Sequence, residues 1–332
     1  MAVSLTVSLA AAEYFLRLTD AVEYRPIHPP IADRVLGRLA YRSSPTPGLS
    51  YELVPASSRR WRRWRITTNS YGMRDREPLP DAAGLVRIAT VGDSFTFGWG
   101  VDASEAYPNA LERLLNEEAE TDVVYDVLNF GVAGYSSRDE AVVLARKVRP
   151  LEPDLVILGY VLNDPEIAPV MPLEAAFAPV EWWQHSHFLR LLAQARWEWD
   201  VHRLGVGDYR RYLHAEDERW HSVEVAFESM RRTTEEMDVP MLLVIFPVIP
   251  PPQGTWDDYI YEDVHARVAE LGRSKGFYVL DLLAAYRRHA PATLGVSRDD
   301  RHPNALGHGI AAHRIAHRLH HQLRDAMAAA AL

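Results

Sequence analysis

The chain has 332 residues, 48% of them apolar, which is enough to bury one large hydrophobic core. Its formal net charge of −9 at pH 7 argues against a nucleic-acid partner, because phosphate binding requires a surplus of Lys and Arg. Cysteine is absent, which excludes disulfides, thiol nucleophiles and zinc sites with cysteine ligands.

The N-terminus begins with an apolar run of twelve residues, Met1 to Ala12, before the first charge at Glu13. This run is shorter than the roughly 20 residues that a spanning helix needs, and it lacks the cationic start of a signal peptide. Two interpretations stay open: an amphipathic helix docked on the domain, or the tail of a longer anchor. Both leave peripheral membrane association through the N-terminus open.

Residues 1 to 80 are rich in Pro, Arg and Tyr, with strand-like pieces at Leu49 to Val54 and Trp64 to Thr68. We expect an N-terminal extension over 1–80, made of a membrane-proximal helix and an accessory β segment. Within it, Ser57 to Arg65 places five arginines around two tryptophans. We interpret this stretch as a solvated β-ribbon face, with base stacking or contact with anionic lipid as the alternative.

Five short β-branched runs bounded by turn residues predict strands, and they alternate with stretches of helical period. The predicted strands are Arg87–Val91, Val123–Phe130, Leu155–Leu162, Pro240–Pro247 and Phe277–Leu282. The predicted helices are Tyr107–Glu118, Arg138–Val148, Val223–Met237, Tyr259–Leu271 and Ala305–Met327.

Alternating strands and helices predict parallel βαβ units, and apolar strands predict a sheet covered on both faces. We therefore expect a three-layer α/β/α domain over residues 81–332. Residues 165–220 break the alternation and hold five of the nine tryptophans, which indicates an insertion. In such sheets ligands bind at the carboxyl ends of the strands, so the residues that follow the first three strands become candidates.

The first predicted strand runs into Gly92 to Gly98, GDSFTFG, where a glycine turn delivers Ser94 to the start of a helix. A hydroxyl there lies beside free backbone N–H groups in the positive field of the helix N-terminus, which suits a nucleophile whose attack generates an oxyanion. Taken alone, the same pattern is more typical of a serine N-cap after a tight turn.

Three further blocks carry polar or glycine residues suited to the same rim. The second strand ends in the glycine-punctuated loop Asn129 to Ser136, whose backbone can approach a substrate closely. The third strand ends at Asn163 and Asp164, which supply an amide donor. Near the C-terminus, residues 299–304 read DDRHPN, with a carboxylate three residues ahead of His302.

The four blocks GDSFTFG at 92–98, the glycine loop ending at Gly134, ND at 163–164 and DxxHPN at 299–304 resemble those of the GDSL/SGNH hydrolase family, in the same order. The resemblance implies a flavodoxin-like SGNH hydrolase fold with a five-stranded, mainly parallel sheet. It also implies a serine esterase with no cofactor and no metal.

Matching positions make Ser94 the nucleophile, His302 the general base and Asp299 the acid that orients it. The oxyanion hole would consist of the N–H of Ser94, the N–H of Gly134 and the side-chain amide of Asn163. Asp300 competes with Asp299, and Gly131 competes with Gly134, because each lies beside the matched residue. The resemblance gives Asp93 the task of holding the turn through local hydrogen bonds.

The expected reaction is ester cleavage through an acyl-enzyme, on a small-molecule or carbohydrate ester. The upstream pieces YELVP and TTNSYGMRDRE resemble those of envelope-associated SGNH proteins, among which are polysaccharide deacetylases and acetyltransferases. That resemblance favours an O-acetyl ester and an extracytoplasmic or membrane-associated location. An O-acyltransferase with the same triad, and a non-catalytic binding module, are the alternatives.

Four other patterns in the sequence suggest other folds or sites, but each has less support. Residues 92–96 nearly match the elbow of α/β-hydrolases, but Thr96 replaces its last glycine. A dinucleotide-type glycine pattern at 98–103 starts six residues past the expected turn. The last helix carries His313, His317, His320 and His321, which we interpret as a solvated face and not as a metal site. The insertion's tryptophans can line a substrate pocket or form a local core: Trp182, Trp183, Trp197 and Trp199.

Overall fold

The computed structural model describes residues 2–19, 40–61, 64–119, 122–165, 182–205 and 207–320. Its centre is a five-stranded sheet in the order β6-β5-β7-β8-β9, with every neighbouring pair parallel. The strands are β5 (Leu85–Gly92), β6 (Val124–Asn129), β7 (Leu155–Tyr160), β8 (Met241–Ile245) and β9 (Tyr278–Asp281). In chain order this is the 2-1-3-4-5 arrangement of flavodoxin-like folds, so the predicted fold class is confirmed.

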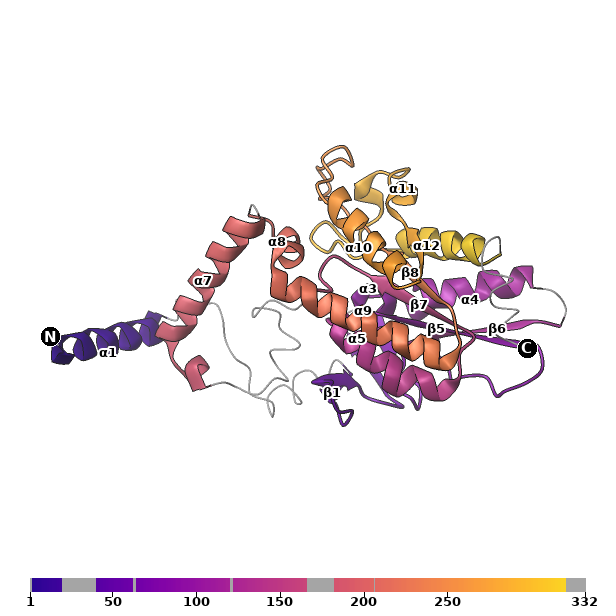
Figure 1. The fold of residues 1–332 in the computed structure, drawn as a ribbon, viewed down its shortest axis with the longest axis horizontal. Coiled ribbons are helices and arrows are strands. Elements are labelled where there is room, and N and C mark those ends of the chain that lie inside the picture. The colour runs from indigo at the N-terminus through magenta and orange to yellow at the C-terminus, as the bar shows by residue number, and fades with distance from the viewer. Residues whose placement is uncertain are drawn as a thin grey trace.

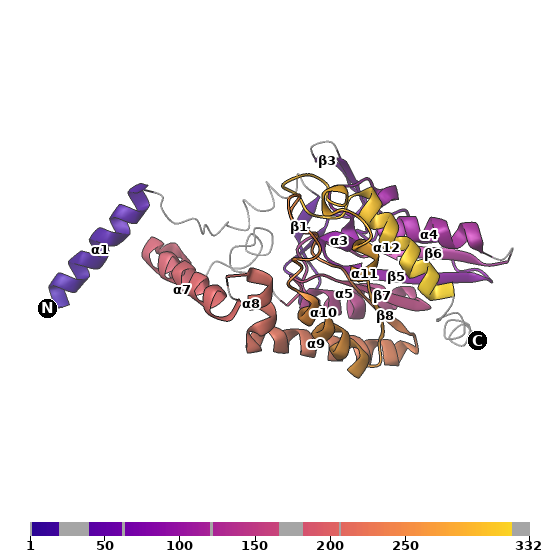
Figure 2. The same cartoon turned by 90° about the horizontal axis from the view of Figure 1, so that it is seen from above.

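Helices cover both faces of the sheet and complete the three layers (Figures 1 and 2). On one face α4 (Tyr107–Glu118) packs against α12 (Ala305–Arg318). On the other lie α5 (Ser137–Val143), which continues as the π-helix η3 (Leu144–Val148), then α9 (Asp217–Met237) and α10 (Glu262–Ser274). The short connecting helices are α3 (Ser94–Phe97), η2 (Ala103–Glu105), η4 (Arg149–Leu151), α11 (Leu283–Tyr286) and η6 (Pro291–Thr293).

Two of the three inner strands, β7 and β8, explain why the sequence of this domain contains long apolar runs. Every residue of β7 and of β8 is buried, because helices cover the sheet on both sides. The carboxyl ends of β5, β6 and β7 are adjacent in the strand order, so the loops that follow them share one edge of the sheet. The expected strands therefore deliver the predicted motifs to the same place.

Residues 40–80 belong to the core of the sheet domain. They form two antiparallel pairs: β1 (Tyr41–Ser43) with β2 (Tyr51–Leu53), and β3 (Ser58–Trp61) with β4 (Trp64–Thr67). Their buried side chains join the main hydrophobic cluster of the sheet and its helices: Tyr41, Tyr51, Leu53, Ile66 and Met73. This segment, expected as an accessory part of an extension over 1–80, therefore packs against the sheet domain. The arginines of the basic stretch that are described with their burial, Arg59, Arg60 and Arg65, are exposed on the β3–β4 ribbon.

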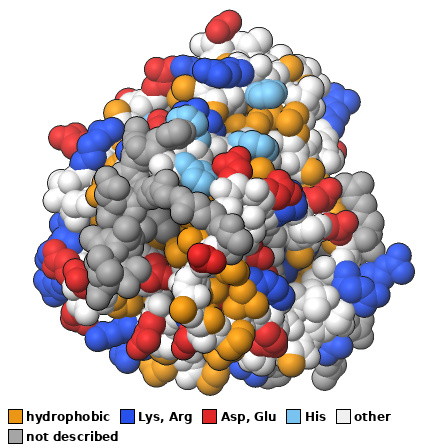
Figure 3. Space-filling view, turned by 90° about the vertical axis from the view of Figure 1, so that its right-hand side faces the viewer, with side chains coloured by type: hydrophobic (Ala, Val, Ile, Leu, Met, Phe, Trp, Pro, Cys, Tyr) orange, Lys and Arg blue, Asp and Glu red, His pale blue; other side chains and the backbone are white. Residues whose placement is uncertain are grey.

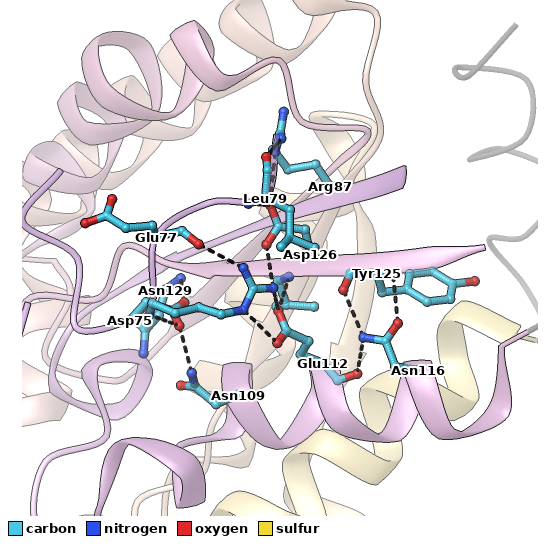
Figure 4. A network of polar contacts seen from close by, with 12 residues as sticks. Asp75, Glu77, Leu79, Arg87, Asn109, Glu112, Asn116, Tyr125, Asp126 and Asn129 are labelled. Atoms are coloured by element: carbon cyan, nitrogen blue, oxygen red, sulfur yellow. Dashed lines mark hydrogen bonds and ion pairs between the residues drawn. The ribbon is translucent and has the colours of Figure 1, made fainter. Parts of the chain in front are cut away.

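A polar network fastens the end of this segment to the sheet (Figure 4). Asp75 accepts the backbone N–H of Asn129, at the carboxyl end of β6, with an N–O distance of 3.0 Å. Arg76 pairs with Glu112 of α4 and with the fully buried Asp126 of β6, each at 2.7 Å. Burial raises the pKa of Asp75 to about 6. The segment therefore connects the second strand and the first covering helix directly.

A second group of helices stands apart from the three layers, at the end of the molecule where the N-terminus lies (Figure 1). It contains α1 (Ala2–Thr19), η5 (Trp182–His185) and α7 (His187–Gly205), and α8 (Tyr209–Ala215) links it to α9. The insertion expected at 165–220 is described only in part, since 166–181 and 206 lie outside the described residues. Among the helices that are described, none is both long and apolar enough to cross a membrane.

Candidate active site

The turn after β5 holds Ser94 at the first residue of α3. The Asp93 side chain caps this short helix by accepting the N–H of Phe95 at 2.8 Å. Ser94 is 8% exposed, and Asp93 and Thr96 beside it are fully buried. The local task expected of Asp93, holding the turn, agrees with this hydrogen bond.

The loop before α12 brings His302 to the same edge of the sheet. Asn304 caps α12 by accepting the N–H groups of Leu306 and Gly307, and its own amide donates to the carbonyls of Thr293 and Gly295. The carbonyl of His302 accepts the N–H of Val296 at 2.9 Å. The loop is therefore tied at both ends, which limits the positions that the imidazole can take.

Ser94, His302 and Asp300 form a continuous chain of hydrogen bonds. The Ser94 Oγ lies 2.9 Å from His302 Nε2, and His302 Nδ1 lies 2.6 Å from Asp300 Oδ1. The serine comes from the turn after β5, and the other two residues come from the loop before α12, where His302 lies 208 positions further along the chain. This order of contacts is that of a nucleophile, a base and an orienting acid.

The carboxylate in this chain is Asp300, whereas the sequence comparison led us to expect Asp299. Asp300 also accepts the backbone N–H of His302 at 3.2 Å, so its side chain folds back beneath the imidazole. The turn that places it there is closed by the N–H of Ser297 on the carbonyl of Asp300. Asp299, one residue earlier, is exposed.

The environment of Asp300 favours its ionised form. Burial raises the pKa of this carboxyl, but the hydrogen bond and the charge of His302, together with a hydrogen bond from the side chain of Trp99, lower it below the ordinary value. Trp99 also lies against the base, with 6.1 Å between the two ring centroids, and Phe95 does the same at 5.5 Å. Sequence reasoning missed Trp99, although it directly follows the GDSFTFG block.

The residues expected to bind an oxyanion lie around the same turn. Gly134 has a φ of +86°, a backbone conformation that favours glycine. Within the described residues, the N–H groups of Ser94 and Gly134 donate to no other group. The N–H of Gly131, the competing position, already donates to Asn129 Oδ1 at 2.9 Å. A side chain at Gly131 would also overlap Phe97 N, at 2.2 Å from its Cβ.

The side chain of Asn163 reaches the nucleophile through Asp93. Its Nδ2 donates to Asp93 Oδ2 at 3.1 Å, and the Ser94 Oγ lies 3.1 Å from that same oxygen. An amide nitrogen carries two hydrogens, so one remains for a ligand. The structure therefore brings Asn163 beside Ser94, as the sequence predicted for this residue.

Three buried carboxyl groups lie behind the nucleophile. Burial raises the pKa of Asp93, Glu140 and Asp164. Neighbouring carboxylates, Asp93 among them, raise the pKa of Glu140 and Asp164 further. Both carboxyl oxygens of Glu140 lack a hydrogen-bond partner among the described residues. A raised pKa favours the neutral form of a carboxyl group, which limits the negative charge beside a site in which an oxyanion would form.

The histidines of the last helix, considered above as a metal site, lie apart from the triad. No cluster of three or more His, Cys, Asp or Glu residues in the described part of the chain is placed to hold a metal ion. His313 and His317 are exposed on α12, while His321 lies outside the described residues. The face to the right in Figure 1 shows histidines among interspersed cationic and anionic side chains (Figure 3).

The tryptophans of the insertion divide into packed and exposed residues. Trp183 packs against Leu16, and Trp197 packs in the small core of α7 and α8. Trp182 and Trp199 are 76% and 66% exposed. The interpretation as a local core therefore holds for Trp183 and Trp197, and the exposed pair forms part of a surface described below.

Arg74 joins the upstream segment to the nucleophile turn, and sequence reasoning missed it. Its guanidinium donates to the carbonyls of Phe97, Gly98 and Val101 at 3.0, 2.6 and 2.7 Å. The residue is 1% exposed, and burial lowers its pKa to about 10. Arg74 thus stabilises the end of α3 and the loop that presents Trp99.

Arg74→Met should lower the free energy of unfolding by about 3 kcal/mol. Three buried carbonyls would lose their donor at a cost of roughly 1–3 kcal/mol each, partly offset because a buried cation is removed. Urea denaturation measures the difference, with Arg59→Met on the exposed β3–β4 ribbon as the matched control. Equal stability of the two variants would contradict the role assigned to Arg74.

Comparison with known proteins identifies the part of the chain that carries this geometry. Residues 90–310 match the model of the GDSL-like lipase/acylhydrolase family. A lipase/acylhydrolase from Enterococcus faecalis is 16% identical over 70% of this chain and 95% of its own, with a TM-score of 0.43. An acetylxylan esterase from Geobacillus stearothermophilus is 19% identical over 75% and 96%, with a TM-score of 0.46. No curated protein sequence matches the chain.

Proposed function

This chain belongs to the GDSL-like lipase/acylhydrolase family and is a hydrolase of ester bonds, and we propose that Ser94, His302 and Asp300 are its catalytic triad. The observation that carries the proposal is the unbroken hydrogen-bond chain from Ser94 Oγ through the imidazole to Asp300. A serine becomes a useful nucleophile when an adjacent base can take its proton and a third group orients that base.

In the proposed reaction, Ser94 Oγ attacks the ester carbonyl carbon while its proton passes to His302 Nε2. Asp300 accepts the Nδ1–H of the imidazole, which fixes the tautomer that leaves Nε2 free to act as the base. The tetrahedral intermediate then expels the alcohol, which takes the proton from Nε2, and an acyl-enzyme forms. A water molecule, deprotonated by the same nitrogen, attacks the acyl carbon and releases the acid and free Ser94.

The negative charge of the tetrahedral intermediate requires donors aimed at its oxygen. We assign this role to the N–H groups of Ser94 and Gly134 and to the remaining amide hydrogen of Asn163. The two backbone groups have no other acceptor among the described residues, and Asn163 shares an acceptor with Ser94. Donors held in place before the reaction stabilise the developing charge without having to reorganise.

Trp99→Phe should lower kcat roughly 10-fold with little change in KM, because the indole N–H that orients Asp300 is lost while an aromatic ring still lies against His302. The same substitution made in an Asp300→Asn background should have almost no further effect. A purely structural role would give equal losses in both backgrounds and would contradict this account. Trp183→Phe, in a separate cluster, is the matched control.

We propose an O-acetylated carbohydrate as the substrate class. The support is the resemblance of residues 51–77 to the upstream segment of envelope-associated family members, together with the contact of Arg74 from this segment with the nucleophile turn. The test compares acetate release from acetylated oligosaccharides with the hydrolysis of p-nitrophenyl esters of two to sixteen carbons. A preference for acetyl groups on sugars supports the proposal, and a preference for long acyl chains contradicts it.

A further inference from the structure

The helices that stand apart from the sheet expose an unusual share of the molecule's apolar surface. We call α1, η5 and α7, residues 2–19 and 182–205, the outer helix unit. Fourteen large apolar side chains are exposed in the described part of the chain, and eight of them belong to this unit. They include Val7, Leu9, Tyr14, Phe15, Trp182 and Trp199, which are between 42% and 76% exposed. Such a concentration of exposed apolar groups indicates an interaction surface.

The junction of α1 and α7 fixes the direction in which this surface points. The Glu13 carboxylate accepts the N–H groups of His187 and Phe188 at 3.0 and 2.8 Å and the hydroxyl of Ser186 at 2.9 Å. Burial raises the pKa of Glu13, but these hydrogen bonds hold it at about 2. Leu16 packs against the start of α7 beside these contacts. The two helices therefore form one unit at the end of the molecule (Figures 1 and 2).

Six consecutive residues near the start of α1 are exposed, which is more than one full helical turn. Each residue from Thr6 to Ala11 is exposed, and residues 2–12 contain no charged side chain. A protein groove would cover one face of a helix, whereas residues 6–11 of this stretch are exposed all around the helix and carry apolar or small side chains. At a rise of 1.5 Å per residue its eleven residues extend about 16 Å, roughly half the ~30 Å hydrocarbon thickness of a bilayer. A surrounding apolar solvent suits this stretch better than a single groove.

The residues that follow have the order found at a membrane surface. After the apolar stretch come Glu13, which contacts the start of α7, and then the exposed Tyr14 and Phe15. Arg17 donates to the carbonyl of His185 at 3.1 Å and so holds η5, with its exposed Trp182, beside this end of α1. Aromatic and then cationic side chains are typical of the interface between hydrocarbon and water.

The charge of the outer helix unit differs from that of the rest of the chain. It carries four arginines and three carboxylates, a net charge of +1, while the whole chain carries −9. An anionic lipid surface would therefore repel the rest of the chain but not this unit. This difference favours docking with the outer helix unit toward the bilayer.

We propose that the outer helix unit docks on a lipid bilayer, with the apolar stretch of α1 among the acyl chains and Tyr14, Phe15 and Trp182 at the headgroups. The sheet domain and its active site then lie on the water side. This inference concerns location and does not depend on the triad or on the substrate.

Vesicle co-sedimentation of the whole chain tests the proposal, with phosphatidylcholine vesicles and with vesicles containing one quarter phosphatidylglycerol. The native chain should sediment with both kinds of vesicle. The double variant Val7→Glu/Leu9→Glu should lose at least 10-fold in partition coefficient, because two charges would enter the hydrocarbon. Val225→Glu, at a 55% exposed valine of α9, should bind like the native chain and is the matched control.

Circular dichroism checks that the variants fold, which is expected because Val7 and Leu9 are exposed. Absence of vesicle binding by the folded native chain would overturn the proposal, as would equal losses in the double variant and the control. Sedimentation velocity without lipid gives a third outcome: a native dimer that Val7→Glu/Leu9→Glu converts to a monomer would identify a second copy as the occupant and would also overturn it.

Discussion

Ser94→Ala should lower kcat for ester hydrolysis by roughly 10⁴- to 10⁶-fold while leaving the fold intact. The alanine removes the oxygen that would form the acyl-enzyme, and the donors around the turn would then assist only the slow direct attack of water on the ester. Steady-state hydrolysis of p-nitrophenyl acetate measures the loss, and thermal unfolding monitors the fold.

Ser104→Ala, at an exposed serine of η2, is the matched control and should keep native activity. A decrease of less than about 10-fold in Ser94→Ala would show that another group attacks the ester, because loss of a serine nucleophile typically costs several orders of magnitude. The assignment of the triad would then be wrong even though the family assignment stands.

Asp300→Asn should lower kcat by roughly 10³- to 10⁴-fold, whereas Asp299→Asn should change it less than about 3-fold. The asparagine at 300 can present its amide hydrogens to His302 Nδ1, which favours the tautomer with a proton on Nε2 and blocks proton transfer from Ser94. The exposed side chain of Asp299 makes no such contact with the imidazole. Parallel kinetics on the two variants decide between neighbouring carboxylates that the sequence pattern could not separate.

Catalysis that depends on ionised Asp300 should decrease only at low pH. The pKa of this carboxyl group in the folded enzyme lies below the ordinary value of 3.8, so Asp300 stays ionised at neutral and mildly acidic pH. The hydrogen bond to His302 is lost only as the pH falls through that lowered value.

A larger effect of Asp299→Asn than of Asp300→Asn on kcat at neutral pH would reverse the choice between the two carboxylates.

The sequence predicted the architecture well because the sheet is buried on both faces. Every residue of 155–160 and 241–245 is buried, with Gly159 the one position that lacks a side chain, and the helices between the strands keep a helical period. Four of the five strands are two or three residues shorter than predicted, because the hydrogen bonds between strands end before the apolar pattern does. The strand β5 is longer than predicted and spans residues 85–92. The predicted helix at 223–237 begins earlier, at Asp217, because Glu216 caps it.

The candidate site was predictable to the extent that its residues lie in short motifs. Ser94, Asn163 and His302 come together because parallel strands and the last loop deliver them to one edge. The choice between Asp299 and Asp300 depends on a turn closed by Ser297, and no residue spacing shows which neighbour folds back toward the imidazole.

Residues that support the site through tertiary contacts could not be predicted from sequence motifs. Arg74 lies 20 positions before Ser94 and stabilises the nucleophile turn through three carbonyl groups, which carry no side-chain signal. Trp99 touches both His302 and Asp300 only because two distant loops meet. The same reason explains why residues 40–80 join the main core and could not be recognised as part of it from composition.

The most direct test of the activated serine is labelling with a fluorophosphonate, followed by intact-mass measurement of the native chain and of Ser94→Ala. This reagent reports a nucleophilic serine without requiring knowledge of the substrate. The account predicts one adduct on the native chain, mapped to Ser94 by peptide analysis, and none on Ser94→Ala. No adduct on the folded native chain, or an adduct that persists in Ser94→Ala, would contradict it.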